Sequence, residues 1–259
     1  MSSSLSAELE VALRAAKRAQ QVIMAHYRPG VAVRLKEDGT PVTQADVEAE
    51  SAIIETIRDR FPDHSFLGEE TGGGAAPGEW LWVLDPLDGT SNFARGIPLF
   101  ATQIALLRNG HPVLGVSNAP ALGELLYGDD GHGAHLNGDR VHVSSISDLA
   151  KAHISVGGLE YFIAAGQMDS LVRVMAAADR VRGFGDAYAY HLVATGRCEA
   201  VVETGVRVWD IAALSAIVRE AGGECTDIRG NEITLDTRDV ICSNGLVHHH
   251  LVELLARAS

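Results

Sequence analysis

The hydrophobic and polar positions along the chain change their pattern near residue 144. Before that point, two stretches carry apolar residues at helical spacing, and several short apolar segments follow that are separated by polar turns such as Asn109-Gly110. After it, strand-like and helix-like segments alternate. This pattern predicts an α/β (α+β) protein with two helices and an antiparallel sheet in residues 1–143, and a smaller α/β half in residues 144–259.

The predicted elements follow from these periods. Pro86 cannot donate to a sheet ladder, so we expect the strand before it to end at or near that residue. No stretch is typical of a linker, which predicts that the halves pack closely with the functional site between them. The predicted helices cover residues 5–27, 43–60, 159–178, 188–195, 210–221 and a last segment from 246. The predicted strands cover residues 31–35, 64–68, 81–84, 101–108, 112–118, 125–127, 133–136, 140–143, 153–156, 181–182, 200–203, 224–227 and 240–243.

Acidic side chains follow three of the apolar segments. Asp85 and Asp88 come after the buried strand 81–84, Glu69 comes after another strand, and Asp210 follows Val208-Trp209. Two simpler interpretations exist. A DxxD pair is usually part of a turn, and Asp210 could serve as a helix N-cap and nothing more. Together they offer the several oxygen ligands that Mg²⁺ requires, and the chain has no paired-cysteine cluster for zinc.

The residues after Asp88 are suited to an anion. Gly89-Thr90-Ser91 forms a small-residue turn that begins a helix, where free backbone N–H groups and the helix dipole favour a phosphate. The Thr90 hydroxyl has a second possible use in orienting an attacking water. Asp46 could accept a hydrogen bond from Thr90 and polarise it, although the sequence does not show that contact.

Composition excludes several classes of function. The net charge of −13 excludes the basic surface of a nucleic-acid-binding protein. No apolar run reaches the roughly 18 residues of a membrane span, and no leader pattern begins the chain, so we expect a cytoplasmic protein without membrane or nucleic-acid partners.

Cys198, Cys225 and Cys242 are odd in number and lack CxxC spacing, which predicts reduced, buried thiols. The GxSxG and GxxxxGK[ST] motifs are both missing.

The acidic motifs resemble, in order and over nearly the whole chain, those of the inositol monophosphatase family. Members of that family are Mg²⁺-dependent, lithium-sensitive phosphomonoesterases, so the resemblance implies hydrolysis of a small phosphate ester. It also implies a layered αβαβα sandwich of the inositol monophosphatase and fructose-bisphosphatase type, and a homodimer. The motifs are Gly68-Glu69-Glu70, Asp85-Pro86-Leu87-Asp88-Gly89-Thr90-Ser91-Asn92-Phe93, and Trp209-Asp210-Ile211-Ala212-Ala213 followed by Glu220-Ala221-Gly222-Gly223.

The resemblance implies a role for each matching residue. Glu69, Asp85 and the Leu87 carbonyl would hold a first Mg²⁺, and Asp85, Asp88 and Asp210 a second. Glu69 would also steer a third, weaker ion and, with Thr90, the attacking water, which gives two or three ions per site. Lys36 is either part of a loop that approaches these metals or a solvated turn lysine.

The substrate is indicated by a different stretch. Residues 183–191 read Gly-Phe-Gly-Asp-Ala-Tyr-Ala-Tyr-His, which is similar to the histidinol-phosphate phosphatases of the superfamily, as is Lys-Glu-Asp-Gly-Thr-Pro-Val-Thr at 36–43. Histidinol carries an ammonium and an imidazole, with which Asp186 and Glu203 could pair. The alternative for Asp186 is a helix N-cap. The predicted substrate-binding residues are Asp88, Gly89, Thr90, Ser91, Gly185, Asp186 and Glu203.

The sequence therefore predicts hydrolysis of L-histidinol phosphate to L-histidinol in histidine biosynthesis. An inositol-1-monophosphatase or a broad-specificity sugar phosphatase is the alternative enzyme. A catalytically silent regulatory member of the family is the alternative outside enzymes, and the intact Glu69, Asp85, Asp88, Thr90 and Asp210 count against it.

Overall fold

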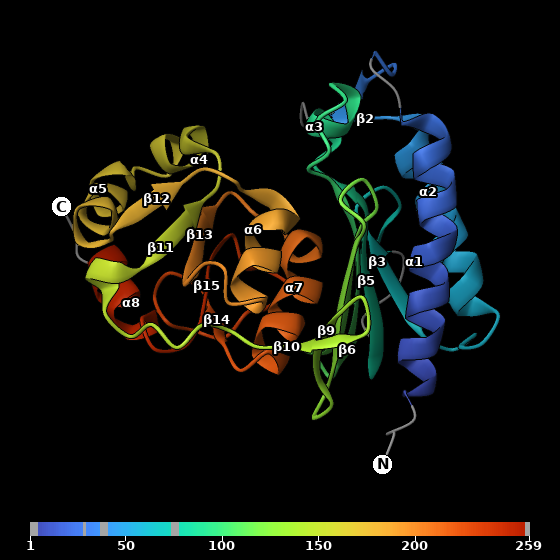
Figure 1. Cartoon of the computed structure of the whole chain (residues 1–259). Coiled ribbons are helices and arrows are strands. Elements are labelled where there is room, and N and C mark those ends of the chain that lie inside the picture. Colours follow the sequence, from blue (N-terminus) through green and yellow to red (C-terminus); the bar gives the residue numbers. More distant parts are fainter. Residues whose placement is uncertain (1–4, 28–29, 37–40, 74–77, 257–259) are drawn as a thin grey trace.

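The protein is a stack of five layers, as a computed structural model that describes residues 5–27, 30–36, 41–73 and 78–256 shows. A pair of helices covers an eight-stranded sheet, a second pair of helices follows, and a five-stranded sheet is then covered by three further helices (Figure 1). The αβαβα sandwich predicted from the sequence is confirmed.

The outer pair of helices is amphipathic. Helix α1 (Ala7–His26) begins after Ser6, whose side chain accepts from the Leu9 amide at 3.1 Å. Helix α2 (Gln44–Arg58) begins after Thr43, which shares a reciprocal capping arrangement with Asp46. Their apolar faces pack on one face of the large sheet in a single buried cluster. Burial of this face, more than intrinsic propensity, holds both helices in place.

The large sheet is antiparallel at every pairing except that of β3 with β5, which is parallel. A separate two-stranded sheet contains β1 (Arg34–Leu35) and β2 (Pro41–Val42), so the strand predicted at 31–35 is shorter than expected. The strands of the large sheet are, in spatial order, β10 (Asp139–Val141), β9 (Gly133–Leu136), β8 (Glu124–Asp129), β7 (His111–Ala119), β6 (Ala101–Arg108), β5 (Trp80–Asp88), β3 (Ser65–Gly68) and β4 (Gly72–Gly73).

Strand β5 ends at Asp88, shortly after Pro86, so the expectation that it ends near that proline is confirmed. Asp85 pairs with Gln103 and Asp88 with Ala101, with a shift of register between the two pairs. Pro86 and Leu87 lie in this irregular stretch, where the missing N–H of proline costs no ladder hydrogen bond. The bulge brings both carboxylates to the end of one strand.

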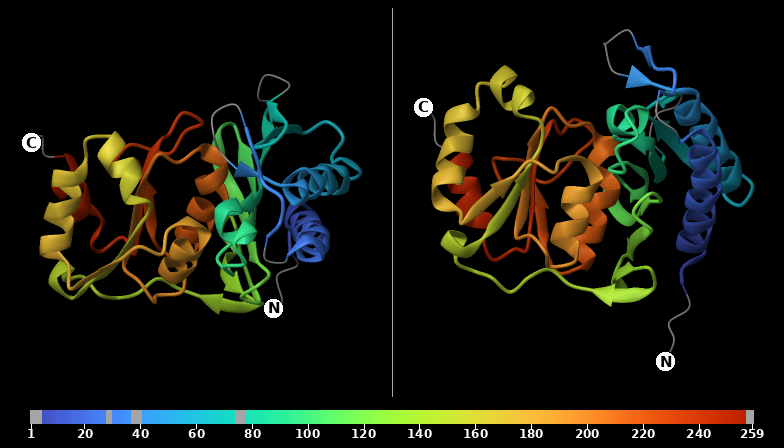
Figure 2. Two further views of the ribbon diagram at one scale, coloured as in Figure 1. Left: turned by 90° about the horizontal axis from the view of Figure 1, so that it is seen from above. Right: turned by 45° about the horizontal axis from the view of Figure 1, so that its top comes forward.

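Helices α6 (Asp186–Ala194) and α7 (Val208–Glu220) form the middle layer between the sheets (Figure 2). Helix α7 is buried on nearly all sides, and its residues belong to two different apolar clusters. It packs so closely on β7 that a Cβ at Gly115 would collide with the Ala213 carbonyl. The second half of the chain therefore supplies a helical layer that covers the first sheet.

The second sheet has parallel and antiparallel neighbours. One long helix was predicted over 159–178, but Gly166, at φ +66°, separates two shorter helices, because that backbone conformation cannot continue an α-helix. Among the described residues, no helix is both long and apolar enough to cross a membrane. The strands are, in order, β12 (Arg180–Arg182), β11 (His153–Val156), β13 (Ala200–Thr204), β15 (Asp239–Ser243) and β14 (Glu224–Thr226), with a 3₁₀ turn at Leu149–Lys151, and the helices are α4 (Leu159–Ala164), α5 (Met168–Ala177) and α8 (His248–Ala256).

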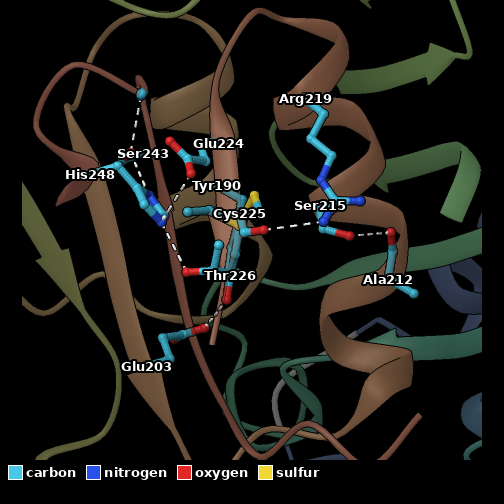
Figure 3. The surroundings of a disulfide bond; sticks show 12 residues. Tyr190, Glu203, Ala212, Ser215, Arg219, Glu224, Cys225, Thr226, Ser243 and His248 are labelled. Carbon is cyan, nitrogen blue, oxygen red and sulfur yellow. Dashed lines mark hydrogen bonds and ion pairs between the residues drawn. A yellow bond between two sulfur atoms is a disulfide. The ribbon is translucent and has the colours of Figure 1, made fainter. Parts of the chain in front are cut away.

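The expectation of three reduced thiols was wrong for two of them. Cys225 on β14 lies directly opposite Cys242 on β15, with Cα atoms 4.2 Å apart, and the two form a disulfide (Figure 3). Cys198 is free and buried. A separation of 17 residues along the chain cannot reveal this pairing, because it depends on the register of two antiparallel strands.

The disulfide makes a direct prediction for thiol labelling. Alkylation of the unfolded, unreduced protein should modify Cys198 alone, whereas prior reduction should open all three cysteines to the reagent. Intact-mass spectrometry of the two samples measures this. A Cys225→Ser variant serves as the control, because it should free Cys242 without reduction. Labelling of three thiols in unreduced wild-type protein would contradict the pairing.

A buried hydrogen-bonded chain joins α6 to the large sheet. His191 is completely buried; its Nε2 lies 2.7 Å from Ser117 Oγ on β7, and its Nδ1 lies 2.9 Å from Glu124 Oε2 on β8. Arg197 donates to the same carboxylate at 3.1 Å. The arrangement resembles a Ser-His-acid triad, but the serine is fully buried, so it positions α6 instead of presenting a nucleophile.

Candidate functional site

Two neighbouring strands deliver three of the predicted acids to one edge of the large sheet. Glu69 directly follows β3, and Asp85 and Asp88 lie at the end of β5. Because β3 and β5 are parallel, their carboxyl ends meet, and the Glu69 amide donates to the Leu84 carbonyl at 3.1 Å. The sequence alone predicted this gathering of acids correctly.

Asp210 reaches the same place from the other half. It is the third residue of α7, not its N-cap, and its Oδ2 accepts from the Arg207 amide at 2.7 Å. Such a contact holds the carboxylate at the first turn of the helix, where the dipole favours negative charge. The site is therefore built from residues of both halves of the chain.

The acids line a cavity of about 440 Å³ between the two halves. Two predicted residues lie outside its lining: Asp46 lies behind Thr90, and Glu203 lines a smaller adjoining pocket. The predicted residues that line the cavity are Glu69, Asp85, Leu87, Asp88, Gly89, Thr90, Ser91, Gly185, Asp186 and Asp210.

Burial disfavours the charged forms of Asp85, Asp88 and Asp210. Burial, and then the charges of Glu69 and Asp88, raise the pKa of Asp85 well above its usual range. Burial and the neighbouring Asp186 do the same to the pKa of Asp88. Burial raises the pKa of Asp210 to about 7. Like charges crowded into a region of low dielectric repel one another unless a cation neutralises them.

The donor set fits divalent metal ions. Asp85 accepts from the Leu87 amide at 2.9 Å, and Asp88 accepts from the Ala187 amide at 2.8 Å, so each uses one carboxylate oxygen and leaves the other available. Among the described residues, no lysine, arginine or histidine pairs with Asp85, Asp88 or Asp210. In the part of the chain that the structure describes, no three aspartate, glutamate, histidine or cysteine side chains are arranged so that they could hold a metal ion as they stand. Oxygen donors and uncompensated negative charge are what Mg²⁺ prefers.

Lys36 contacts the acids, which decides between its two interpretations. Its Nζ lies 2.7 Å from Glu69 Oε1 and 2.6 Å from Glu70 Oε1. Burial lowers the pKa of Lys36, but the hydrogen bonds to Glu69 and Glu70 outweigh it and raise the pKa overall. It is not a solvated turn lysine. The rest of the predicted loop, residues 37–40, lies outside the described residues.

The expected contact between Thr90 and Asp46 is present. Thr90 Oγ1 lies 3.0 Å from Asp46 Oδ1 and 3.0 Å from the Leu87 carbonyl oxygen. The other oxygen of Asp46 accepts from both the amide and the hydroxyl of Thr43. Donation from Thr90 to Asp46 leaves the lone pairs of the hydroxyl free to accept a hydrogen bond from a water.

The predicted phosphate cradle begins a short helix, α3 (Thr90–Ala94). Gly89 precedes it at φ +83°, and a Cβ there would lie 2.7 Å from the Leu99 carbonyl oxygen, so only glycine fits. The amides of the first residues of a helix have no partner within the helix. Those of Thr90 and Ser91 therefore suit an anion beside the metal ligands.

Asp186 lies beside the helix that this cradle begins. It is the first residue of α6, at φ +47°, and Gly185 is the N-cap, so the capping role considered for Asp186 was wrong. Its Oδ2 accepts from the Asn92 side chain at 3.0 Å. Burial raises its pKa. A left-handed backbone is strained at a residue other than glycine. The hydrogen bond from Asn92 helps to hold Asp186 in this conformation.

Glu203 lies beneath Asp186. Its Oε2 accepts from the Tyr190 hydroxyl at 2.6 Å and its Oε1 from the Asp186 amide at 3.2 Å. Burial raises the pKa of Glu203 to about 8. Both oxygens thus have protein donors, which ties Glu203 to the position of α6.

Sequence reasoning missed several residues of the cavity. Asn92 orients Asp186, but 94 residues separate them and no local pattern links the two. Tyr161 and Phe184 place aromatic rings at the cavity. Gly157-Gly158 directly after β11 was an available signal, because glycines at a strand end often mark close approach of another group.

The profile of the family described as "Inositol monophosphatase family" matches residues 4–259. The chain is 36% identical to "Histidinol-phosphatase" of Chlorobaculum parvum, over 96% of each chain. It is 37% identical to "Inositol-1-monophosphatase" of Mesorhizobium japonicum, over 97% of each chain.

A solved structure shares the whole fold. The extragenic suppressor protein suhB from Bartonella henselae superimposes with a TM-score of 0.90 at 34% identity, covering 98% of this chain and 100% of that one. The three proteins carry three different names at nearly the same identity. Overall similarity therefore does not distinguish among their substrates.

Proposed function

Because this chain belongs to the inositol monophosphatase family of phosphatases, we propose that it is a Mg²⁺-dependent enzyme that hydrolyses L-histidinol phosphate to L-histidinol and phosphate. The observation that carries the choice of substrate is the partly buried carboxylate of Asp186, which lines the cavity without a basic partner among the described residues. A cationic substrate would supply that partner.

The proposed metal ligands are those that the resemblance to the family implies. Glu69, Asp85 and the Leu87 carbonyl would hold one Mg²⁺, Asp85, Asp88 and Asp210 a second, and Glu69 would take part in a third. Bound Mg²⁺ would supply a more acidic water and stabilise negative charge on the leaving oxygen. Two or three ions would neutralise the acids whose burial otherwise disfavours their charge.

The chain's own groups would position the reactants. The Thr90 hydroxyl, donating to Asp46, would accept from the attacking water and aim it at phosphorus. The amides of Thr90 and Ser91, preceded by Gly89, would bind phosphate oxygens. Attack by the water in line with the ester oxygen then gives inorganic phosphate and the free alcohol.

The substrate's cationic end would lie toward the second half. After the metal ligands are counted, Glu160, Asp186 and Glu203 remain as further acids in or beside the cavity. Asp186 would contact the ammonium or imidazolium, and Glu203 would act through its hold on the Asp186 amide. An uncharged polyol offers only hydroxyls and leaves these acids unpaired.

One assay tests the proposed function against its two alternatives, an inositol or sugar phosphatase and a regulatory protein without activity. Phosphate release with Mg²⁺ is measured from L-histidinol phosphate and inositol 1-phosphate side by side. We expect at least about tenfold higher kcat/KM for histidinol phosphate, which equals roughly 1.4 kcal/mol of transition-state stabilisation. A tenfold preference for the inositol ester, or equal use of several sugar phosphates, contradicts the proposal. No turnover of any ester would favour a regulatory protein.

Replacing Asp186 with asparagine should separate the two substrates. The change keeps the shape of the side chain and its contact with Asn92 but removes the charge. We expect kcat/KM for histidinol phosphate to fall by about ten- to a hundredfold, because charge-assisted hydrogen bonds contribute about 1.5 to 3 kcal/mol. Hydrolysis of inositol 1-phosphate should fall far less. Asp169→Asn, at an exposed acid on α5, is the control, and equal losses on both esters would disprove this role.

The remaining expectations are retained as proposals. We propose a homodimer, inhibition by lithium and a cytoplasmic location. Exposed apolar residues of α4 and α5, such as Ile163 and Val172, offer a surface for self-association, which sedimentation would measure. The Cys225–Cys242 disulfide removes the support that reduced thiols gave to a cytoplasmic location.

A further inference from the structure

A second, smaller pocket of about 130 Å³ adjoins the cavity. We call it the side pocket. A water occupies about 30 Å³ in the liquid, so the side pocket has room for a group of about four or five heavy atoms. It shares part of its lining with the main cavity, so the two are continuous. The shared residues are Asp88, Gly157, Gly158, Tyr161, Asp186 and Asp210, and the side pocket adds Tyr190, Glu203, Thr204, Gly205 and Val206.

Tyr161 forms a wall common to both pockets. It lies on α4 and is 51% exposed, which is unusual for an aromatic residue that lines a cavity. Its ring lies against Gly205, where an added Cβ would come within 2.7 Å of the ring carbon Cδ1. Gly205 has φ +80°, so both the space and the backbone conformation require glycine there. The fold therefore keeps the ring at this place.

The ring has no polar partner of its own. Among the described residues, no hydrogen bond is made by the Tyr161 hydroxyl, whereas Tyr190 in the same pocket donates to Glu203. Tyr190 thus has a structural contact, and Tyr161 presents an unpaired aromatic surface to the cavity. Packing against Gly205 alone does not account for a half-exposed tyrosine.

The side pocket also has an acidic lining. Gly157 leaves room for Glu203, since a Cβ there would lie 2.7 Å from Glu203 Oε1. Asp186 adds a second carboxyl group, with one oxygen bound to Asn92. An aromatic ring and two carboxyl groups in one small pocket favour a flat cation, because the ring quadrupole attracts positive charge and a bound cation favours the ionised form of both carboxyls.

We propose that Tyr161, held over Gly205, is a specificity-determining residue that stacks on the planar cationic ring of the substrate in the side pocket. This inference rests on the proposed function, because it assigns a place to the imidazolium of histidinol phosphate. The phosphate would remain at the Gly89–Ser91 turn and the metal ligands. The first half of the chain would thus bind most of the phosphate end of the substrate, and the second half would bind its cationic ring.

The test measures binding of the dephosphorylated alcohol. Calorimetric titration of the Mg²⁺-loaded protein with L-histidinol, and with inositol for comparison, requires no turnover. Cation–π contacts contribute about 0.5 to 2 kcal/mol, so Tyr161→Leu should weaken histidinol binding by roughly 2- to 30-fold, while Tyr161→Phe should change it by less than about twofold. Gly205→Ala, which displaces the ring, should resemble the leucine variant.

The control is Ile163→Leu, at a 65% exposed residue of the same helix that lines neither pocket. Unchanged binding in Tyr161→Leu, or an equal loss in Tyr161→Phe, overturns the inference. If histidinol phosphate is the preferred substrate but Tyr161→Leu binds histidinol normally, only the inference fails. If the inositol ester is preferred while histidinol binding still depends on the Tyr161 ring, only the proposed function fails.

Discussion

Asp85→Asn is expected to lower phosphate release by about a thousandfold or more and, without metal, to raise the thermal stability of the protein. Asp85 is 2% exposed, and Glu69, Asp88 and Asp210 all act on it electrostatically. Asparagine can still accept from the Leu87 amide. It removes a charge that would bridge two Mg²⁺ ions, and it relieves repulsion in the metal-free site.

Two measurements check this pair of effects. Phosphate release with saturating Mg²⁺ gives the loss of activity, and calorimetric melting in excess chelator gives the gain in stability, expected at several degrees. Asp169→Asn should change neither. Substantial activity in Asp85→Asn would contradict its role as a metal ligand, and a lower melting temperature in chelator would show that repulsion among the acids is not the dominant effect.

In excess chelator, the free energy of unfolding should fall as pH rises from about 4 to 8. Burial raises the folded-state pKa of Asp210 to about 7 and that of Glu203 to about 8, above the ordinary carboxyl range. A carboxyl whose pKa is raised on folding binds its proton more tightly in the folded state. Its stabilisation is therefore present at low pH and is lost as pH rises through the folded-state pKa.

Magnesium should reverse that loss. If Asp85, Asp88 and Asp210 hold Mg²⁺ as proposed, the metal would replace the protons on these carboxyls, so the melting temperature at pH 8 should rise with Mg²⁺ concentration and the pH dependence should flatten. Chemical denaturation across the pH range, with and without Mg²⁺, measures both effects. A free energy of unfolding that increases from pH 5 to 8 in chelator would contradict the raised pKa values of these carboxyls. A melting temperature at pH 8 that does not change with Mg²⁺ concentration would contradict their role as metal ligands.

The acidic centre was predictable because strand ends leave a local signature. Glu69, Asp85 and Asp88 each follow an apolar segment that reads as a strand, and parallel neighbours bring such ends together. The layered fold was predictable for the same reason, since periods of two and 3.6 residues identify strands and helices separately. Strand β5 continues beyond Pro86 to Asp88, because a β-bulge between Asp85 and Asp88 accommodates the proline. Such a bulge has no clear sequence signal.

The substrate side depends on contacts between distant residues. Asn92 meets Asp186 across 94 residues, and Tyr161 lies over Gly205 only because α4 and the end of β13 are adjacent in space. Neither contact follows from hydrophobic periodicity. The Cys225–Cys242 pair has the same origin, since strand register, not cysteine spacing, makes the two residues neighbours.

The place of α7 has a consequence for synthesis on the ribosome. The large sheet is complete once β10 ends at Val141, but the helix that covers its inner face begins only at Val208. Residues Leu81, Val83, Ala105 and Leu107 of that face pack against α7 in the finished protein. While the intervening residues are translated, we expect these side chains to form an uncovered apolar surface, which would expose the nascent chain to chaperones and to aggregation until α7 emerges.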